Sequence, residues 1–552
     1  MNRITAVILF LCLFGAGFRV HSEDAPADLI LTNGTIITMD PSLPKAEAIA
    51  VRGDRIVWIG EEADIGKWLG RSTRVIGLKG AYVFPGLIDS HAHVTGLGSA
   101  QVTIDLVGTA DLPSVLEKVK ERVAKAAPGQ WVQGRGWDQN DWPEKKFPSA
   151  SDLDRVAPDH PVFLERIDGH AGWVNTKALK LGGVTGATKD PEGGKIHRDA
   201  AGNPTGILVD TAMDLVASKM EALSQEELIE RTKLAAQDAL SKGITMIHDA
   251  GSSKDDINAW KAMALKKELP IRIYSMVAMP SSFGEEYLRK KPQQFDPYLD
   301  IRSMKLLVDG AMGSRGAAML EPYIDDPGNT GLLMWKEADL MRVLRAAKAS
   351  GIQVGIHAIG NKANRMILDA YEKVGVNGLR WRIEHAQLLS SQDIPRFAKI
   401  DVIASMQPIH ATSDMPWYAD RVGKERTKAG AYVWRSLLDN KAIIAGGSDA
   451  PVEDINPLWG LYAAITRQDH KGKPEAGWLP EQRVSREEAI RMFTLDAAYA
   501  AFREKDLGTL TTGKLADMIV LPENLLTCDP KAMIDMKVLY TIVGGQVRYQ
   551  GK

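Results

Sequence analysis

The chain has 552 residues, of which 68 are Lys or Arg and 70 are Asp or Glu, so the formal net charge is −2. This balance argues against a protein that binds nucleic acid by neutralising phosphates, which requires a surplus of basic residues. The length allows a large buried core, and the 50 glycines suit a fold with many tight turns between strands and helices.

The N-terminal segment differs in composition from the rest of the chain. Arg3 precedes an almost wholly apolar run over residues 4–18. This pattern predicts a cleaved secretory signal over residues 1–22, and hence a secreted or periplasmic protein with no stable membrane span after cleavage. An uncleaved membrane anchor is the alternative, but the run is short for a span of about 20 residues. Cleavage would remove Cys12 and leave Cys528 alone, so no internal disulfide is expected.

Short strand patterns separated by turns occupy both ends of the chain. The dipeptides Asn33-Gly34 and Gly53-Asp54 each lie between two apolar runs and predict two β-hairpins. The C-terminal end has the same texture, with a further turn at Gly544-Gly545. We therefore expect residues 23–84 and 506–552 to pair into one small composite β-sandwich domain.

The middle of the chain alternates apolar runs with helical patterns, as βαβ units do. The predicted strands are 87–89, 244–248, 271–277, 304–309, 353–357, 381–385, 402–407 and 443–446. Eight such strands with helices between them predict a (β/α)₈ TIM-like barrel over residues 85–505. One interval, from about 93 to 243, is too long for a single helical connection, so we expect an inserted α/β subdomain at about 129–209.

Metal-ligand residue types recur where the predicted barrel strands end. In extended backbone His91 and His93 point to the same side, which provides half of a metal site. One such pair is weak evidence, but Asp309, His357, His385 and Asp449 also end or follow predicted strands. Residues at the C-terminal ends of barrel strands converge on the active site in this fold. Lys305 lies inside a predicted buried strand, where an unpaired charge is costly.

Several sequence motifs resemble those of the amidohydrolase superfamily, and more narrowly amidohydrolase family 3, the YtcJ-like or N-substituted formamide deformylase-like branch. The motifs are Pro85-Gly86-Leu87-Ile88-Asp89-Ser90-His91-Ala92-His93, Glu165-Arg166-Ile167-Asp168-Gly169-His170, Lys305-Leu306-Leu307-Val308-Asp309-Gly310, His357-Ala358-Ile359-Gly360, Arg382-Ile383-Glu384-His385-Ala386-Gln387, Gly447-Ser448-Asp449-Ala450-Pro451 and Gly513-Lys514-Leu515-Ala516-Asp517. Together they span nearly the whole chain after residue 22.

The resemblance implies a ligand set for one or two divalent metal ions, with zinc favoured among several ions that suit these ligands. His91 and His93 would bind the more buried ion, and His357 and His385 the second. Lys305, carboxylated to a carbamate, would bridge the two ions. Asp449 would contact a metal and serve as the catalytic base. The alternative for Lys305 is a buried ion pair with Asp309, which would leave a single ion.

Four further residues are candidates for binding the substrate: His170, Asp309, Arg315 and His410. His170 lies in the expected insertion, and a structural role is its alternative. Arg315 belongs to a glycine-rich loop that can hold an anionic group or simply form a tight turn. His410 follows a predicted strand and therefore lies near the barrel mouth.

The expected activity is hydrolysis of an amide-type C–N bond in a small-molecule N-acyl or N-formyl compound, by attack of a metal-activated hydroxide. A cyclic amide, a lactone or a peptide-like substrate is an alternative, because one fold supports many chemistries. A secreted, non-catalytic binding or regulatory barrel is the alternative from another class, and the complete ligand set argues against it. The resemblance also favours a homodimer.

Overall fold

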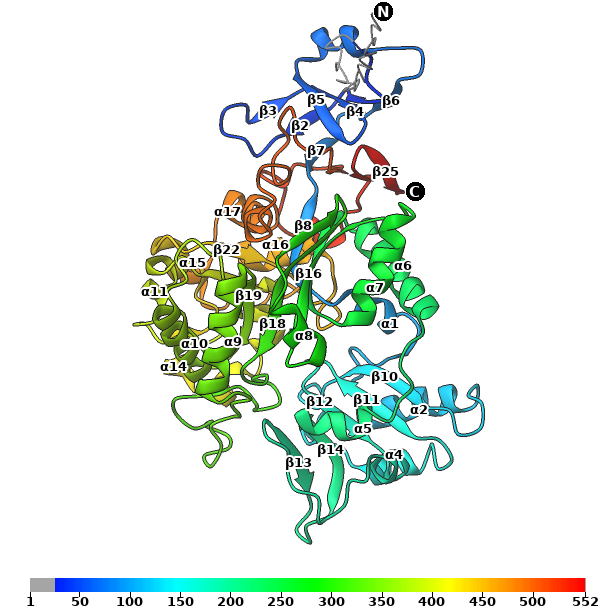
Figure 1. The fold of residues 1–552 in the computed structure, drawn as a ribbon, viewed down its shortest axis with the longest axis vertical. Coiled ribbons are helices and arrows are strands. Elements are labelled where there is room, and N and C mark those ends of the chain that lie inside the picture. Colours follow the sequence, from blue (N-terminus) through cyan, green and yellow to red (C-terminus); the bar gives the residue numbers. More distant parts are fainter. Residues whose placement is uncertain (1–24, 552) are drawn as a thin grey trace, which may run out of the picture.

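The computed structural model describes residues 25–551, so the expected signal over residues 1–22 lies outside the described part. No helix among the described residues is long and apolar enough to cross a membrane. Three parts follow one another in Figure 1: a β-domain, a central barrel and, at the barrel's far end from the β-domain, an inserted subdomain.

The central part is a barrel of parallel strands, as the sequence predicts. Its strands, in spatial order, are β8 (Leu87–Ala92), β15 (Ile244–Ser252), β16 (Arg272–Met279), β18 (Leu299–Leu307), β19 (Gln353–Ala358), β20 (Arg382–His385), β21 (Ile403–Met406) and β22 (Ile444–Gly446). A short strand, β17 (Gln293–Asp296), pairs antiparallel with β18 outside this order. The barrel strands are almost entirely buried on both faces, which explains why apolar residues point to both sides of them.

The gap between the first and last strands is bridged just beyond β22. The Asp449 amide donates to the carbonyl of His91 at 2.7 Å, and the His93 amide donates to the carbonyl of Ala450 at 2.7 Å. These two backbone hydrogen bonds fasten the segment after β22 to the end of β8 and nearly close the barrel. The same segment carries a predicted catalytic residue, so barrel closure and site assembly use the same contacts.

Helices surround the strands and cover the barrel (Figure 1). They are α1 (Val94–Ala100), α6 (Gln225–Ser241), α7 (Lys254–Leu265), α8 (Ser282–Tyr287), α9 (Glu337–Ser350), α10 (Asn361–Val374), α11 (Ile394–Lys399), α12 (Pro408–Asp414), α13 (Tyr418–Val422), α14 (Lys424–Gly430), α15 (Trp434–Asp439), α16 (Pro457–Thr466), α17 (Arg486–Met492), α18 (Leu495–Ala500) and α19 (Ala532–Asp535). Capping boxes start α6 and α7, at Ser224 with Glu227 and at Ser253 with Asp256. The apolar stripe of α9 faces the core, and Gly351 ends that helix in the left-handed conformation.

The inserted subdomain is a mixed six-stranded sheet with helices on both faces. Its strands, in spatial order, are β13 (Gly194–Arg198), β14 (Pro204–Asp210), β12 (Ala171–Val174), β11 (Val162–Arg166), β10 (Val132–Trp137) and β9 (Ile104–Asp105). Its helices are α2 (Leu112–Val123), α3 (Ala150–Asp154), α4 (Thr176–Gly182) and α5 (Asp214–Ala217). The sheet begins at residue 104, upstream of the expected 129. The sequence does not reveal this start, because β9 has only two residues and carries no strand pattern. Trp137, Trp142 and Trp173 pack in its core.

Strands from both ends of the chain form the β-domain, in two sheets around a shared core. One sheet has the order β5 (Arg55–Gly60), β4 (Ala48–Arg52), β1 (Leu29–Thr32) and β6 (Arg74–Gly77). The other has the order β25 (Gln546–Gln550), β24 (Tyr540–Val543), β23 (Met518–Leu521), β7 (Tyr82–Pro85), β2 (Thr35–Ile37) and β3 (Lys45–Ala46). The antiparallel pairing of β23 with β7 joins the two chain ends.

The predicted hairpin at Asn33-Gly34 is wrong, whereas those at Gly53-Asp54 and Gly544-Gly545 form. β1 pairs with β4 and β6, while β2 pairs with β3 and β7 in the opposite sheet. The turn therefore links two layers, because Leu31 and Ile36 both face the core between the sheets.

Candidate active site

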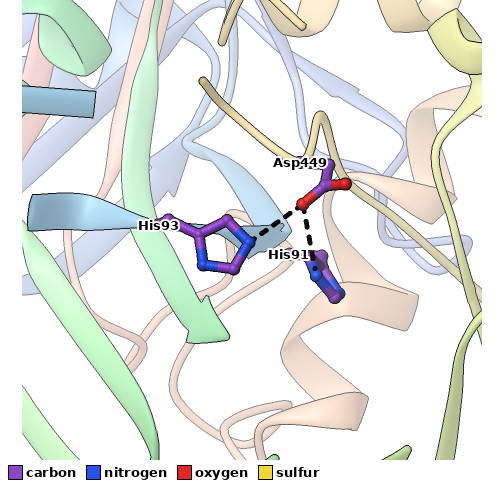
Figure 2. Close-up of side chains that lie close together, drawn as sticks. All are labelled: His91, His93 and Asp449. Carbon is purple, nitrogen blue, oxygen red and sulfur yellow. Dashed lines mark hydrogen bonds and ion pairs between the residues drawn. The ribbon is translucent and has the colours of Figure 1, made fainter. Parts of the chain in front are cut away.

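Two histidines and a carboxylate meet where the first and last barrel strands end. His91 lies in β8, His93 precedes α1, and Asp449 follows β22. Asp449 Oδ1 is 3.1 Å from His93 Nε2 and 3.4 Å from His91 Nε2 (Figure 2). One ligand atom from each residue lies within 4.8 Å of the others, which is close enough for one metal ion.

A second such group shares Asp449. Its Oδ2 atom lies 3.8 Å from His410 Nε2 and 4.0 Å from His385 Nδ1. His385, His410 and Asp449 also bring one ligand atom each within 4.8 Å of one another. His357 lies beside this group, with its ring centroid 4.5 Å from that of His385. The predicted ligands thus converge, and His410, expected to contact the substrate, lies among them.

The backbone at two of these residues is unusual. Asp449 has φ 63° and His385 has φ 72°, in the left-handed region that non-glycine residues seldom adopt. Gly447 allows the last strand to approach β8, since a Cβ there would lie 2.7 Å from the His91 amide nitrogen. Such strain persists only where the surrounding structure enforces it, and it concentrates at functional sites.

Lys305 points into the same cluster from β18. It is 2% exposed, and its Nζ is 3.2 Å from His91 Nε2. Burial lowers the pKa of the Lys305 ammonium. The alternative ion pair with Asp309 is not formed, because the Asp309 carboxylate accepts hydrogen bonds from the backbone amides of Ala318, Ile359 and Gly360.

Glu384 orients His91, a role that the sequence alone does not indicate. Its Oε2 is 2.6 Å from His91 Nδ1, which leaves His91 Nε2 directed at the cluster. Arg382 donates to both carboxylate oxygens of Glu384, at 2.7 and 2.8 Å, and all three side chains are fully buried. Despite burial, Arg382 and His91 hold the pKa of Glu384 well below its usual value. Gln407 plays a similar part for His385, at 2.8 Å from Nδ1.

The donor set fits a divalent metal ion. Burial and the charge of Lys305 lower the pKa of His91 to about 4, so its ring is neutral at pH 7 and offers a lone pair. Burial likewise holds the pKa values of His357 and His385 well below the usual one. The neighbouring imidazoles keep the pKa of Asp449 low against the effect of burial. Neutral imidazoles and a carboxylate are zinc-type ligands.

The remaining predicted substrate-binding residues lie in different surroundings. His170 lines the cavities beside the cluster, with Nδ1 2.6 Å from Asp210 Oδ1. Although burial opposes it, the Asp210 carboxylate raises the pKa of His170 to about 9. Asp309 and Arg315 are not among the described residues that line either cavity. Arg315 instead forms an ion pair with Asp325 at 2.8 Å and does not reach the cluster. Asp309 Oδ1 lies 3.5 Å from His357 Nε2, so Asp309 contacts the cluster through His357.

Two cavities meet at the cluster, one of about 560 Å³ and one of about 1060 Å³. His170, His357, His385 and Asp449 line both of them. The smaller cavity also reaches Lys305, His91 and His93 and is covered by residues of the inserted sheet, such as Arg135. The site is therefore a pocket between the barrel mouth and the insertion, of a size that suits a small molecule.

The fold and the site define the class of protein, and comparison with known proteins identifies the family. The sequence model of the amidohydrolase family matches residues 74–549. Among curated proteins, the chain is 38% identical over 540 residues to protein LONG AFTER FAR-RED 3 of Arabidopsis thaliana, covering 95% of this chain and 92% of that protein. It is 34% identical over 524 residues to the putative amidohydrolase YtcJ of Bacillus subtilis, covering 94% and 98%. The chain belongs to the amidohydrolase family, a class of metal-dependent hydrolases.

Two further comparisons extend this result. The chain is 27% identical over 545 residues to the N-substituted formamide deformylase of Arthrobacter pascens, covering 95% of this chain and 98% of that enzyme. A crystal structure of an uncharacterized metal-dependent hydrolase from Pyrococcus horikoshii superposes with a TM-score of 0.75 at 28% identity, covering 91% of this chain and 99% of that one. The predicted family and the predicted barrel fold are thereby confirmed.

Proposed function

We propose that this protein hydrolyses an amide-type C–N bond in an N-acyl or N-formyl compound. The observation that carries the proposal is the position of Asp449, whose two carboxylate oxygens face different histidine pairs. One acid–base group thus lies at the centre of the candidate metal ligands. The relative named N-substituted formamide deformylase supports the choice of bond.

His91, His93 and Asp449 would hold one ion, and His357 and His385 would hold a second, with zinc as the proposed identity. When bound, such an ion lowers the pKa of a coordinated water toward about 7 and polarises the substrate carbonyl. Lys305, whose pKa is lowered by burial, is in our proposal carboxylated and provides an anionic oxygen for a second ion.

Asp449 is proposed to act twice. It first accepts a proton from the attacking water, while the water oxygen forms a bond to the carbonyl carbon. It then donates that proton to the leaving nitrogen as the C–N bond breaks, so that a carboxylic acid and an amine are released. The low pKa of Asp449 keeps its carboxylate ionised and ready for the first step.

His410 is proposed to bind the substrate carbonyl oxygen. Its Nδ1 is 3.3 Å from the Gln387 side-chain nitrogen, which donates to it, so its Nε2 carries the hydrogen. That Nε2 atom is buried and has no hydrogen-bond partner among the described residues. A donor in this position stabilises the negative charge that develops on the carbonyl oxygen.

Asp449→Asn tests the proposal, because it preserves the shape of the side chain and removes its basicity. We expect turnover of N-formyl and N-acetyl amides to fall by about 10²–10⁴-fold, the usual contribution of a general acid–base group. The measurement is kcat/KM beside metal content per chain, on protein purified without chelator. An exposed carboxylate, Glu230→Gln on α6, provides the matched control.

Metal content separates the versions of the proposal. Two ions per chain, together with a carbamate signal in carbon-13 NMR, support the carboxylated Lys305. One ion with normal turnover removes the bridging role and keeps the hydrolase. Full activity of the Asp449→Asn variant, or no hydrolysis of any amide by the wild type, contradicts the proposed mechanism.

A further inference from the structure

The larger cavity has a lining rich in carboxylates. Asp138, Asp141, Asp168, Asp414 and Glu453 all line it. Arg166 also lines this cavity, but it is already paired with Asp168 at 2.5 Å and with Asp138. The positive charge of Arg166 is thus matched by these two carboxylates.

Three carboxylates of the lining have no such partner. Among the ion pairs of the described residues, none includes Asp141, Asp414 or Glu453, and Asp414 accepts only the Tyr432 hydroxyl, at 2.5 Å. Burial and neighbouring carboxylates raise the pKa of Glu453 to about 7 and that of Asp414 well above its usual value. A bound cation would relieve this mutual repulsion.

An independent feature of the same cavity also indicates a ligand that donates hydrogen bonds. Gln387 is 5% exposed and lines the cavity, yet its side-chain oxygen has no hydrogen-bond partner among the described residues. A buried acceptor without a partner costs about 1–3 kcal/mol unless a ligand satisfies it. An N–H group is the complement of both this oxygen and the carboxylates.

The arrangement favours an organic cation over a second metal site. Within the described residues, both groups of side chains close enough to hold an ion include Asp449, and neither includes Asp141, Asp414 or Glu453. Trp417 lies in the lining as well and offers apolar contact for a carbon chain. The volume of about 1060 Å³ accommodates a molecule rather than an ion.

We propose that the larger cavity binds a protonated amine on one arm of the substrate, so that the preferred substrates are amides with a second, cationic amino group. The inference rests on the proposed amide hydrolysis for the reaction, but not for the cation site itself. Because the cavity meets the smaller one at His357, His385 and Asp449, one molecule can place its amide at the cluster and its ammonium among the carboxylates.

The kinetic test uses two series of simple amides of equal chain length, one varied on the acyl arm and one on the amine arm, in which the variable arm ends in an ammonium, a methyl or a carboxylate group. In one of the two series we expect kcat/KM for the ammonium compound to exceed that for the methyl compound by about tenfold or more. In that series the carboxylate compound should have the lowest kcat/KM. The Asp414→Asn/Glu453→Gln double variant should lose this preference. The Glu230→Gln variant, which changes an exposed carboxylate on α6, should keep it.

A binding test does not depend on catalysis. The metal-loaded protein is titrated by calorimetry at pH 7 with pentylammonium and with pentanol. Tighter binding of pentylammonium than of pentanol, lost in the double variant, supports the cation site even if no amide is hydrolysed. The absence of hydrolysis would contradict only the proposed reaction. Equal binding of the two probes, together with equal kcat/KM for the ammonium and methyl amides, overturns the cation site and leaves the hydrolase intact.

Discussion

Glu384 shows how one buried side chain sets the chemistry of its neighbour. Its carboxylate is 2.6 Å from His91 Nδ1, and it receives two hydrogen bonds from Arg382. Arg382 in turn contacts His248 Nδ1 at 3.0 Å and Ser405 Oγ at 2.7 Å. This network fixes both the tautomer and the direction of the His91 ring before any ligand binds.

Replacing Glu384 with Gln is expected to weaken metal binding about 10–100-fold, because the ionised acceptor that fixes the His91 tautomer is exchanged for a neutral amide. It also leaves the buried Arg382 without its countercharge, which should lower the free energy of unfolding by about 3–5 kcal/mol. Competition with a metal-sensitive dye measures the first effect and urea denaturation the second. Ser405→Ala is the control, since it removes one hydrogen bond from Arg382 and does not contact His91. Wild-type metal affinity in Glu384→Gln would contradict this role.

The site residues that sequence reasoning found and those it missed differ in a physical way. His91, His357, His385 and Asp449 were visible because each ends or follows an apolar strand, so the chain itself places them at the barrel mouth. Glu384 and Gln407 act through partners on other strands, and a single sequence does not specify such contacts. Asp309 has the same strand-end position, but its carboxylate is occupied by three backbone amides.

At the scale of an element, the N-terminus of α17 is held to the neighbouring helix α15 by hydrogen bonds. Ser485 and Glu488 form a capping box at its N-terminus. The Glu488 carboxylate also accepts two hydrogen bonds from Arg435 of α15, at 2.8 and 3.0 Å. The Arg435 hydrogen bond lowers the pKa of Glu488 to about 2.

The stabilisation by Glu488 should depend on pH in a definite direction. Because its folded-state pKa lies below its usual value of 4.5, the contribution is complete above about pH 4.5 and is lost as the pH falls toward 2. Glu488→Gln is expected to reduce the free energy of unfolding by about 1 kcal/mol at pH 7. Urea denaturation at pH 7 and pH 4 measures the change, with the exposed neighbour Glu487→Gln as control. A reduction that grows between pH 7 and pH 4 would contradict this account.

Whole elements were easier to predict than the way they pair. All eight predicted barrel strands form, including short ones such as β20 and β22. The Asn33-Gly34 dipeptide does not determine how its flanking strands pair, because the same turn chemistry serves a hairpin and a connection between two layers, and only tertiary packing decides between them. β9 cannot be predicted from the sequence, because its two residues carry no periodicity.

At the scale of the molecule, a buried ion pair joins the barrel to the β-domain formed from both chain ends. Arg272, at the start of β16, donates to both carboxylate oxygens of Asp517, at 2.7 and 2.8 Å. Asp517 also accepts from the Gly544 amide at 2.8 Å. Both charged side chains are almost fully buried, at 1% and 2% exposure.

Asp517→Asn should therefore be costly, because Arg272 would keep its charge in a buried position without a counterion. We expect the free energy of unfolding to fall by about 3–5 kcal/mol, measured by guanidinium chloride denaturation. The Arg272→Met/Asp517→Leu double variant removes both charges and should lose less than the single variant. If the double variant loses more, the pair contributes net stability and the argument from desolvation is wrong.

The closure of the barrel by the segment after β22 bears on how the protein is made. A nascent chain that has emerged from the ribosome as far as residue 446 contains all eight barrel strands. It still lacks Asp449, which both candidate metal groups share. The β-domain can be completed only later, since its last strand, β25, ends at residue 550. A complete candidate metal site therefore requires synthesis of most of the chain, and a fragment that ends before Asp449 would lack both this carboxylate and the backbone hydrogen bonds that nearly close the barrel.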